Sequence, residues 1–422
     1  MQGDVPPPRV DHHQHLLSPA GAELLNRLAD PVALPEAIER LRAERAKRWN
    51  DKQALAKLFT PDSVVLSGDA PGWIAGSLRG ADFLSTRFAA AYRLVPTSYS
   101  IKGGHGHVAG YYRRGDDAQS RTLGYFHLTL DRARDGSWRI ASEVPVFPGP
   151  RVQQPQTAAD LVRYLDEAGI RRAVVLSDAY YFDSPKLSAH SVDKVRAEND
   201  WTAQQVMQFP ERLVAFCSFN PLLDYALAEL ERCAASGRFT GIKLHFGTSA
   251  VDLNNADHVA KVRRVVEAVN RHRMPLIVHV RAGADYGREQ ARVLLDRIIS
   301  AAPDVVFQIA HLWGGEQYSE AALAVYADAV AADDARMKNV YFDLAEVALV
   351  VGNSDEMART AVARMRQIGM SRMLYGSDGP VADSMSPADA WKAVRKLPLR
   401  DDELKTIAEN VAPYLSAGKR PP

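Results

Sequence analysis

The segment TAADLVRYLDEAGIRRAVVLSD, residues 157–178, contains the pattern that decides the fold. Its first part has apolar residues at helical spacing, with Thr157 placed to cap the start of the helix and Gly169 to end it. Its last part, RRAVVLSD, is apolar without alternation, as a strand buried on both faces of a parallel sheet should be. The segment therefore predicts one helix–strand unit of an α/β fold.

The same unit recurs toward the C-terminus. Similar apolar runs occupy residues 212–220, 240–247, 274–280, 305–312, 338–346 and 372–380. Successive runs are 26 to 41 residues apart, measured at Leu176, Cys217, Lys243, His279, His311, Asp343 and Asp378. Each interval suits one strand and one helix. With a first strand at residues 10–17 the count is eight, which predicts a (β/α)8 TIM barrel; a doubly wound open sheet is the alternative.

One interval is far longer than the others. From Gln14 to Leu176 the chain runs 162 residues, and residues 36–148 differ in character. They begin with one helical stretch and continue as long alternating strands rich in Tyr, Gly and Thr, with RDGS (134–137) at a hairpin turn. We therefore predict an α+β domain, residues 36–148, inserted after the first strand of a barrel formed by residues 1–35 and 149–422.

Composition excludes several classes of partner. The chain has 52 Lys and Arg against 51 Asp and Glu, so its net charge gives no reason to expect binding to nucleic acid or to an anionic membrane. No apolar run approaches the roughly 20 residues of a membrane span. A small-molecule partner is expected, and homo-oligomerisation is left open. The start, MQGDVPPP, does not have the pattern of a signal peptide, so the compartment is left open between the cytoplasm and, if a leader preceded Met1, the periplasm. We interpret Cys217 and Cys233 as separate buried thiols.

Polar residues that end apolar strands form the candidate site, because catalytic groups of a TIM barrel lie at the C-terminal ends of its strands. His13 and His15 lie two apart in the first strand and point the same way, whereas His12 points to the other side. The other strand-end groups are Lys243, His245, His279, His311 and Asp378. Two imidazoles joined by a third imidazole and a carboxylate are a sufficient ligand set for a divalent ion such as zinc.

These motifs resemble the amidohydrolase superfamily, in particular its amidohydrolase-related branch. The resemblance is carried by VDHHQH, GIKLH, PLIVHV, QIAHLWGG and LYGSDGP, and it covers the predicted barrel. It implies one or two bound divalent ions, with zinc expected, held by His13, His15, His279 and Asp378. It further implies that His311 contacts the metal or the reacting group and that Asp378 serves as general base. The insert is similar to the cone-shaped SnoaL-like (NTF2-like) fold, with DGSWRI as the most suggestive piece.

The resemblance leaves the role of Lys243 open. In binuclear members of the superfamily a lysine at the end of the fourth strand is carboxylated and bridges two metal ions. The alternative is a single ion, with Lys243 contacting the substrate. Arg281 could clamp an anionic group or form a surface ion pair. Asp343 and Glu346 follow the seventh strand and could face the substrate or a histidine next to the metal. His245 and Trp313 are the other substrate-binding candidates, and packing explains Trp313 equally well.

Three functions remain. Hydrolysis of an amide, ester or lactone bond by a metal-activated water is the first, and metal-dependent nonoxidative decarboxylation on the same scaffold is the second. The third is a noncatalytic small-molecule binding protein in which the insert performs recognition. Convergence of a general base with metal ligands favours an enzyme. A second His-x-His pair, His105 and His107, lies in the insert near His127, and we interpret these as pocket or surface residues.

Overall fold

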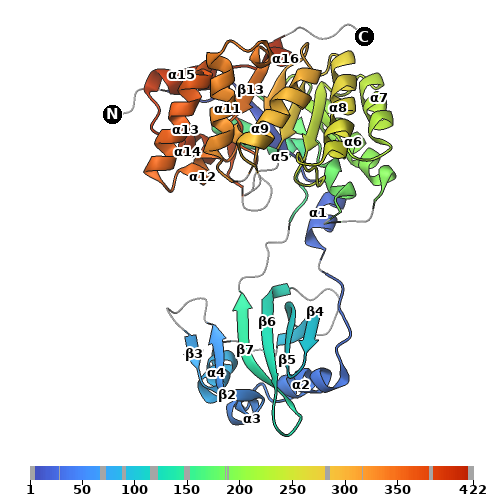
Figure 1. Ribbon diagram of the computed structural model, residues 1–422, viewed down its shortest axis with the longest axis vertical. Helices are drawn as coiled ribbons and strands as arrows, with labels where there is room; N and C mark the ends of the chain where they lie inside the picture. The colour runs from blue at the N-terminus through green and yellow to red at the C-terminus, as the bar shows by residue number, and fades with distance from the viewer. Residues whose placement is uncertain are drawn as a thin grey trace. The chain divides into compact units, whose positions relative to one another are not determined.

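The computed structural model describes residues 5–27, 29–66, 73–87, 92–114, 122–146, 153–185, 187, 190–280, 286–315, 317–379 and 384–416. The chain forms two compact units. One comprises Met1–Asn26 with Gln153–Pro422, and the other comprises Arg27–Val152 (Figure 1).

The first unit is a parallel barrel. Its strands pair in the order β1-β8-β9-β10-β11-β12-β13-β14. They are β1 (Val10–His15), β8 (Arg172–Leu176), β9 (Leu213–Ser218), β10 (Gly241–His245), β11 (Leu276–His279), β12 (Phe307–Ile309), β13 (Val340–Asp343) and β14 (Met373–Leu374). Two hydrogen bonds join β1 to the segment after β14: His12 N donates to Tyr375 O at 2.8 Å, and Asp378 N donates to His13 O at 2.9 Å. The predicted barrel is confirmed, and the open-sheet alternative is wrong.

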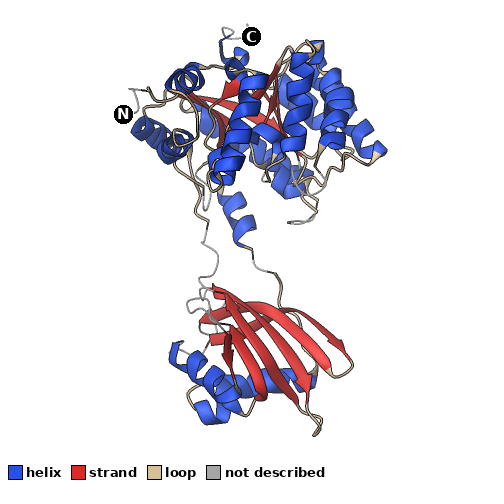
Figure 2. Cartoon of the chain, turned by 60° about the vertical axis from the view of Figure 1, so that its left-hand side comes forward, coloured by secondary structure: helices blue, strands red, loops and turns tan. Residues whose placement is uncertain are grey.

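Helices follow the strands and surround them, as Figures 1 and 2 show. They are α1 (Pro19–Asn26), α5 (Ala158–Ala168), α6 (Val192–Met207), α7 (Ala226–Ala235), α8 (Ala256–Arg271), α9 (Arg288–Val293), α10 (His311–Gly314), α11 (Glu320–Ala331), α12 (Val347–Val351), α13 (Asp355–Ile368), α14 (Pro387–Val394), α15 (Asp401–Glu409) and α16 (Pro413–Ser416). A short 3-10 helix, η1 (Ala179–Asp183), follows β8. Thr157 and Gly169 bound α5 as predicted, through a capping box and a left-handed C-cap.

Alternate side chains of each strand enter two different hydrophobic cores. Ile242 and Leu244 of β10 belong to the large core between strands and helices. Phe216 and Ile277 belong to a small core inside the barrel, closed by Tyr414. Lys243 is the register partner of Ile277, so it points into the barrel as well. The next residues on the same face of these two strands, His245 and His279, therefore also point into the barrel. The alternation therefore directs the polar strand ends to the barrel interior.

The second unit is a six-stranded sheet packed over helices. The strands are β2 (Phe59–Leu66), β3 (Trp73–Ala75), β4 (Tyr92–Lys102), β5 (His105–Arg114), β6 (Thr122–Arg132) and β7 (Trp138–Val146), and the helices are α2 (Glu36–Lys47), α3 (Lys52–Ala56) and α4 (Ser77–Arg87). The strands pair in the order β3-β2-β7-β6-β5-β4 (Figure 2). The predicted α+β insert after the first strand is confirmed.

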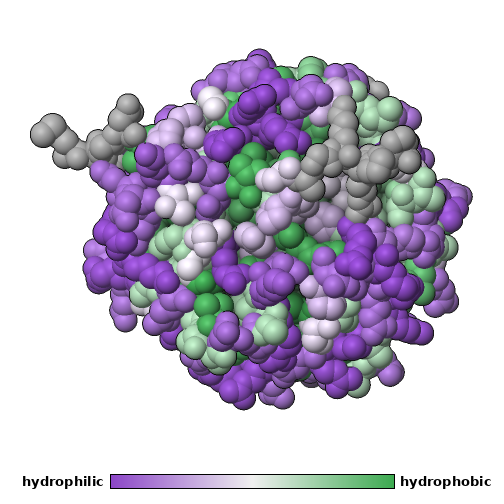
Figure 3. Space-filling view, turned by 90° about the horizontal axis from the view of Figure 1, so that it is seen from above, coloured by the Kyte–Doolittle hydropathy of each residue, from purple (hydrophilic) through white to green (hydrophobic). Residues whose placement is uncertain are grey.

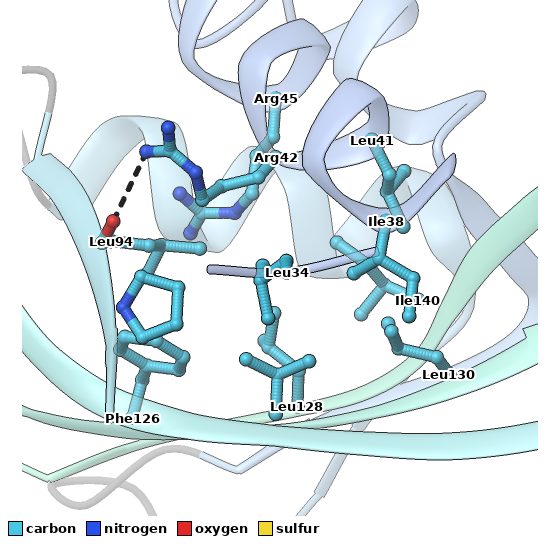
Figure 4. A pocket seen from close by; sticks show the side chains of 12 residues that line it. Leu34, Ile38, Leu41, Arg42, Arg45, Leu94, Phe126, Leu128, Leu130 and Ile140 are labelled. Carbon is cyan, nitrogen blue, oxygen red and sulfur yellow. Dashed lines mark hydrogen bonds between the residues drawn. The ribbon is translucent and has the colours of Figure 1, made fainter. Parts of the chain in front are cut away.

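Side chains fill the space between α2 and this sheet. Figure 4 shows Leu34 facing Leu128 and Ile38 facing Ile140 and Leu130, with Arg42 donating to Leu94 O at 3.2 Å. The remaining cavity is about 10 Å³, room for about one water molecule. At this position, side chains of the described residues therefore leave no ligand-sized cavity.

A buried ion pair anchors α2 to the sheet. Arg45 Nη2 donates to Glu143 Oε1 at 2.5 Å, and both side chains are at most 2% exposed. Tyr112 Oη donates to the same carboxylate oxygen at 2.7 Å. The Arg45 guanidinium also lies 4.5 Å from the Trp49 ring centroid. The buried Glu143 carboxylate thus has Arg45 as its counter-charge and accepts a hydrogen bond from Tyr112.

The surface is mostly polar. Figure 3 shows hydrophilic side chains over most of the visible face, with hydrophobic ones scattered among them. None of the helices in the described ranges has both the length and the apolar character needed to cross a membrane.

The interpretation of the two cysteines as separate thiols is wrong. Cys217 at the end of β9 and Cys233 in α7 form a disulfide, with their Cα atoms 6.3 Å apart. The α7 helix packs against the strand that precedes it, and this brings residues 16 apart in sequence into contact. Spacing alone does not report that contact.

Removing the positive partner of Glu143 should unfold the insert unit first. Arg45→Met should lower the free energy of unfolding by about 3–5 kcal/mol, because it leaves a buried carboxylate without its counter-charge. Urea titration followed by tryptophan fluorescence measures this. Lys52→Met is the control, since its pair with Asp82 is more than half exposed and should contribute less than about 1 kcal/mol. Equal effects of the two substitutions would contradict the assignment.

Candidate metal centre

Two histidines of β1 reach the barrel interior from the same strand. His13 and His15 are 0% and 6% exposed, and both line a cavity of about 340 Å³. The pairing register of β1 with β8 shifts between Asp11 and Gln14. His12 lies outside the cavity lining: its Nδ1 bonds Tyr375 O at 3.0 Å, and its Nε2 accepts from Ala412 N at 3.1 Å. The three clustered histidines therefore separate into two cavity residues and one structural residue.

Asp378 meets these histidines from the last strand. Its Oδ1 lies 3.3 Å from His13 Nε2 and 3.3 Å from His15 Nε2. Its Oδ2 lies 3.8 Å from His311 Nε2. The backbone bond from Asp378 N to His13 O sets this position. One carboxylate thus faces three imidazole nitrogens.

Each β1 histidine has a second carboxylate at its other nitrogen. His13 Nδ1 bonds Asp343 Oδ2 at 3.1 Å, and His15 Nδ1 lies 2.7 Å from Asp178 Oδ1. Asp343 also accepts from Gln308 Nε2 at 2.7 Å and from His311 N at 2.9 Å, so its own position is fixed. A carboxylate at Nδ1 holds the proton there and leaves Nε2 to face the cavity.

Burial and neighbouring charges set the protonation of the site. Burial, with Lys243 nearby, lowers the pKa of His13 to about 4, so this imidazole is neutral. Burial also lowers the pKa of His15, but Asp178 and then Asp378 outweigh it and raise that pKa to about 9. Burial raises the pKa of Asp378, but His13, His15 and His311 shift it well below its ordinary value, so it is ionised. The site thus combines an anion with imidazoles.

The other predicted site residues lie at the ends of β10, β11 and β12. Lys243 is fully buried, and its Nζ lies 3.2 Å from His13 Nε2. Burial, opposed by Asp378, lowers the pKa of Lys243 to about 8. His245 stacks on His279, with ring centroids 3.9 Å apart. His279 Nδ1 in turn lies 3.1 Å from His311 Nε2. The structure therefore brings all of these strand-end groups together.

The structure does not place the other two substrate-binding candidates, Arg281 and Trp313, among the lining residues that it describes. Arg281 falls outside the described residues. Trp313 is fully buried, donates from Nε1 to Gly315 O at 2.6 Å and packs edge-on against Tyr318. It is not among the described residues that line the cavity.

The histidines of the insert are surface residues. His105 pairs with Asp131 at 2.7 Å, and the rings of His107 and His127 lie 5.6 Å apart. All three histidines are exposed. Among the residues that the structure describes, none of the three belongs to a group of His, Cys, Asp or Glu close enough to hold an ion.

Four residues that line the cavity were not predicted: Asp178, Tyr180, Tyr181 and Ser384. Tyr180 Oη donates to Asp178 Oδ1 at 2.9 Å, and the Tyr180 ring lies 4.8 Å from that of His245. Asp178 follows the strand run RRAVVL directly, so the strand-end rule could have found it. Tyr180 and Tyr181 lie in η1 and Ser384 lies in a loop, where strand periodicity gives no signal.

The donor set fits a divalent ion. Ligand atoms of His13, His15 and Asp378 all lie within 4.8 Å of one another. Two ligands at about 2.1 Å from a tetrahedral ion are about 3.4 Å apart, close to the observed separations of 3.3 Å. Imidazole and carboxylate suit zinc and similar borderline ions. The carboxylates at both Nδ1 atoms complete the arrangement usual for histidine ligands.

A TIM barrel with such a donor set at the carboxyl ends of its strands is the framework of a metal-dependent enzyme. The chain belongs to the amidohydrolase family, whose sequence model matches residues 10–412. The resemblance drawn from the motifs is thereby confirmed for the barrel.

Solved structures share parts of the fold. A 5-carboxyvanillate decarboxylase from Novosphingobium aromaticivorans, complexed with manganese, is 15% identical with a TM-score of 0.41, covering 59% of this chain and 77% of that chain. A probable 2-pyrone-4,6-dicarboxylic acid hydrolase from Acinetobacter baumannii is 16% identical with a TM-score of 0.41, covering 62% and 88%. A putative calcium/calmodulin-dependent protein kinase II association domain from Xanthomonas campestris is 17% identical with a TM-score of 0.24, covering 28% and 94%. No curated protein matches.

Removing the carboxylate behind His13 should weaken metal binding. Asp343→Asn should lower the affinity for Zn²⁺ by about 10- to 100-fold, because Asn holds the Nδ1 proton less firmly. Competition with a chromophoric chelator measures the affinity. Asp328→Asn is the control, since Asp328 is exposed and pairs only with Arg288 at 3.4 Å. An unchanged affinity in Asp343→Asn would show that His13 needs no such support.

A carboxyl next to the site should make stability depend on pH. Glu198 Oε2 accepts from Ser18 Oγ at 2.5 Å, and Ser18 Oγ also accepts from Gly21 N at the start of α1. Burial raises the pKa of Glu198 from its ordinary 4.5 to about 7, against the lowering effect of the Ser18 hydrogen bond. The folded chain therefore keeps a proton that the unfolded chain loses, so stability falls as the pH rises from about 4.5 to about 7.

Glu198→Gln should remove this dependence. Between pH 4.5 and 7 the wild type should lose about 3 kcal/mol of unfolding free energy that the variant retains. Urea titrations at several pH values across this interval measure the difference. Parallel profiles for the two proteins would contradict the role of Glu198.

Proposed function

We propose that this member of the amidohydrolase family is a metal-dependent hydrolase that cleaves an amide, ester or lactone bond of a small molecule. The observation that carries the proposal is the position of Asp378. Its carboxylate lies beside the donor nitrogens of His13 and His15 and also within reach of His311, inside a cavity of about 340 Å³. A base in that place is what hydrolysis requires and what binding alone does not.

Several residues are available to hold the ion. His13, His15 and Asp378 form its primary site, and we propose His279 as a further ligand. Zinc is the expected ion. A divalent ion in such a site lowers the pKa of water and polarises a carbonyl oxygen. The cavity is near the lower end of the range for small-molecule sites.

The protein's own groups supply the proton transfers. Ionised Asp378 accepts the proton of the attacking water and returns it to the leaving group. His311 donates its Nδ1 proton to Ala345 O at 3.0 Å, so its Nε2 is the accepting nitrogen, 3.1 Å from His279 Nδ1 and 3.8 Å from Asp378 Oδ2. Lys243 faces the same space from β10 and can donate to a substrate oxygen.

We propose the wall of the cavity as the substrate-binding surface. His245 stacks on His279 and lies 4.8 Å from the tilted Tyr180 ring, and this cluster of rings would suit contact with a planar group. Arg281 remains a proposed contact for an anionic group, since it follows the strand that ends at His279.

Nonoxidative decarboxylation is the second candidate. Lys243 is the only Lys or Arg among the described lining residues, and it lies beside the proposed metal ligands, where a carboxylate would bind. A decarboxylase and a probable hydrolase stand among the similar structures, and their likeness concerns the fold alone. The two reactions differ in whether a water molecule is consumed.

Reaction in ¹⁸O-labelled water distinguishes the candidates. The Zn²⁺-loaded protein should convert members of a panel of aryl esters, lactones and amides, placing label in the new carboxylate without CO₂ release. Asp378→Asn, assayed at saturating Zn²⁺ with its metal content measured, should lose at least about 100-fold in kcat. Asp328→Asn should retain the wild-type rate. Release of CO₂ from hydroxybenzoates without label would establish the second candidate instead.

A further inference from the structure

We propose that Tyr414, at the end of the barrel opposite the cavity, is a positioning residue for the metal centre. Its hydroxyl holds the amide of Gln308, and Gln308 in turn holds the carboxylate behind His13. The proposal rests on the metal-dependent function proposed above. It goes beyond that function because it gives residues 412–416, which are not among the described lining residues, a part in metal binding.

Residues 412–416 lie at the amino ends of the barrel strands. Arg172, the first residue of β8, donates from Nη1 to Leu415 O at 3.3 Å. The Tyr414 ring packs edge-on against Phe216 of the small core inside the barrel, with the ring centroids 5.4 Å apart. Figure 1 shows α16 at the end of the barrel unit away from α1, the helix that follows β1. The Tyr414 side chain therefore enters the barrel from the end opposite the cavity.

Gln308 is a polar residue in the interior of the barrel. It lies in the middle of β12, is fully buried, and is the register partner of Ile277 in the small core. Branched apolar side chains usually occupy such positions in a TIM barrel. An amide buried there is unfavourable unless its donors and its acceptor are hydrogen-bonded. The partners of the Gln308 amide therefore determine whether the barrel can accommodate it.

These partners fix the orientation of the Gln308 amide. Nε2 donates to Asp343 Oδ2 at 2.7 Å and to His12 O at 3.3 Å. A carboxylate and a backbone carbonyl can only accept, so the nitrogen must face them. Oε1 consequently points to the other end of the barrel, where Tyr414 Oη donates to it at 2.8 Å.

The hydrogen bonds continue from Gln308 to the proposed metal ligand. Asp343 Oδ2 accepts from Gln308 Nε2 and also from His13 Nδ1 at 3.1 Å. The other oxygen, Oδ1, accepts from two backbone N–H groups at 2.9 and 3.3 Å. A proton held at Nδ1 leaves His13 Nε2 for the ion. Tyr414, Gln308, Asp343 and His13 thus form one hydrogen-bonded relay from the amino ends of the strands to the metal centre.

A second contact joins the same segment to the strand of the ligand. Ala412 N donates to His12 Nε2 at 3.1 Å, and His12 O accepts from Gln308. The backbone beside His13 is therefore held both directly by the C-terminal segment and through the amide that Tyr414 orients. This gives His12, the structural member of the three clustered histidines, a place next to the relay.

Loss of the Tyr414 hydroxyl would leave Gln308 Oε1 buried without its donor. A buried acceptor in that state is unfavourable, so the amide would turn or shift toward other partners. Nε2 would then no longer be fixed between Asp343 and His12. The Asp343 carboxylate would hold the His13 ring less firmly, and binding of an ion at Nε2 would weaken.

Zn²⁺ affinities of matched variants test the proposal. Tyr414→Phe removes only the hydroxyl and should weaken Zn²⁺ binding by about 2- to 10-fold, the usual range for one neutral hydrogen bond. Competition with a chromophoric chelator measures this on protein that circular dichroism shows to be folded. Tyr326→Phe is the control, because the Tyr326 hydroxyl is also buried and bonds that of Tyr286 at 2.7 Å, in α11 outside the barrel. It should bind Zn²⁺ as the wild type does.

A double-mutant cycle separates the relay from a general loss of packing. Gln308→Leu interrupts the relay at its middle and should weaken Zn²⁺ binding at least as much as Tyr414→Phe. Adding Tyr414→Phe to Gln308→Leu should bring no further loss, because the hydroxyl has already lost its acceptor. Additive losses, or equal affinities in Tyr414→Phe and Tyr326→Phe, would overturn the positioning role.

Nitrogen NMR of the ¹⁵N-histidine-labelled, metal-free chain provides a readout that needs no ion. His13 should carry its proton on Nδ1 in the wild type and in Tyr326→Phe, and Tyr414→Phe should increase the share with the proton on Nε2. An unchanged share would contradict the relay. A wild type that binds Zn²⁺, shows the variant losses and hydrolyses no ester, lactone or amide supports the relay and overturns the proposed reaction. A wild type that binds no Zn²⁺ overturns both.

Discussion

The hydrogen bond from Asp378 N to His13 O is the contact on which the rest of the site depends. It joins the first strand to the segment after the last strand and so closes the barrel. The same residue brings its carboxylate to the Nε2 atoms of His13 and His15. The contact that closes the barrel therefore also brings the carboxylate and the two imidazoles of the donor set together. A change that opens the seam between β1 and β14 removes the site as well.

Two further carboxylates contact the histidines and orient their rings. Asp343 and Asp178 stand at the Nδ1 atoms of His13 and His15, and the Nε2 atoms consequently face the cavity. Such a concentration of buried negative charge is unfavourable without compensation. Protonation of His15 in the ion-free chain supplies part of it, because Asp178 and Asp378 raise the pKa of His15 to about 9 despite burial. A bound cation would take over that role and displace the proton.

The barrel and most of the cavity could be predicted from the sequence because both follow from the period of the strands. Alternation places His13 with His15 and Lys243 with His245, and the strand-end rule adds His279, His311 and Asp378. Glu346, expected to face the substrate or a histidine, lines the cavity. The left-handed backbone at Glu346 and His311 could not be predicted from the sequence pattern. The disulfide between Cys217 and Cys233 depends on helix packing, which spacing does not encode. Asp343 was expected to face the substrate or a histidine, and it contacts His13 Nδ1. Asp178 was missed although it too follows a strand directly.

The insert interrupts the barrel sequence between β1 and β8, at a place where the geometry of the site is kept. It separates β1 from β8, yet His15 and Asp178 from these two strands are in contact at 2.7 Å. Within the barrel unit the departing and returning segments hold each other: Leu17 and Gln156 exchange backbone hydrogen bonds, and Asn26 bonds the backbone of Gln153 through both its amide atoms. Closing a longer loop adds only about 0.6 kcal/mol for each doubling of its length. Because these bonds pin both ends of the insertion, the register of β1 against β8, and with it the geometry of His15, is set inside the barrel.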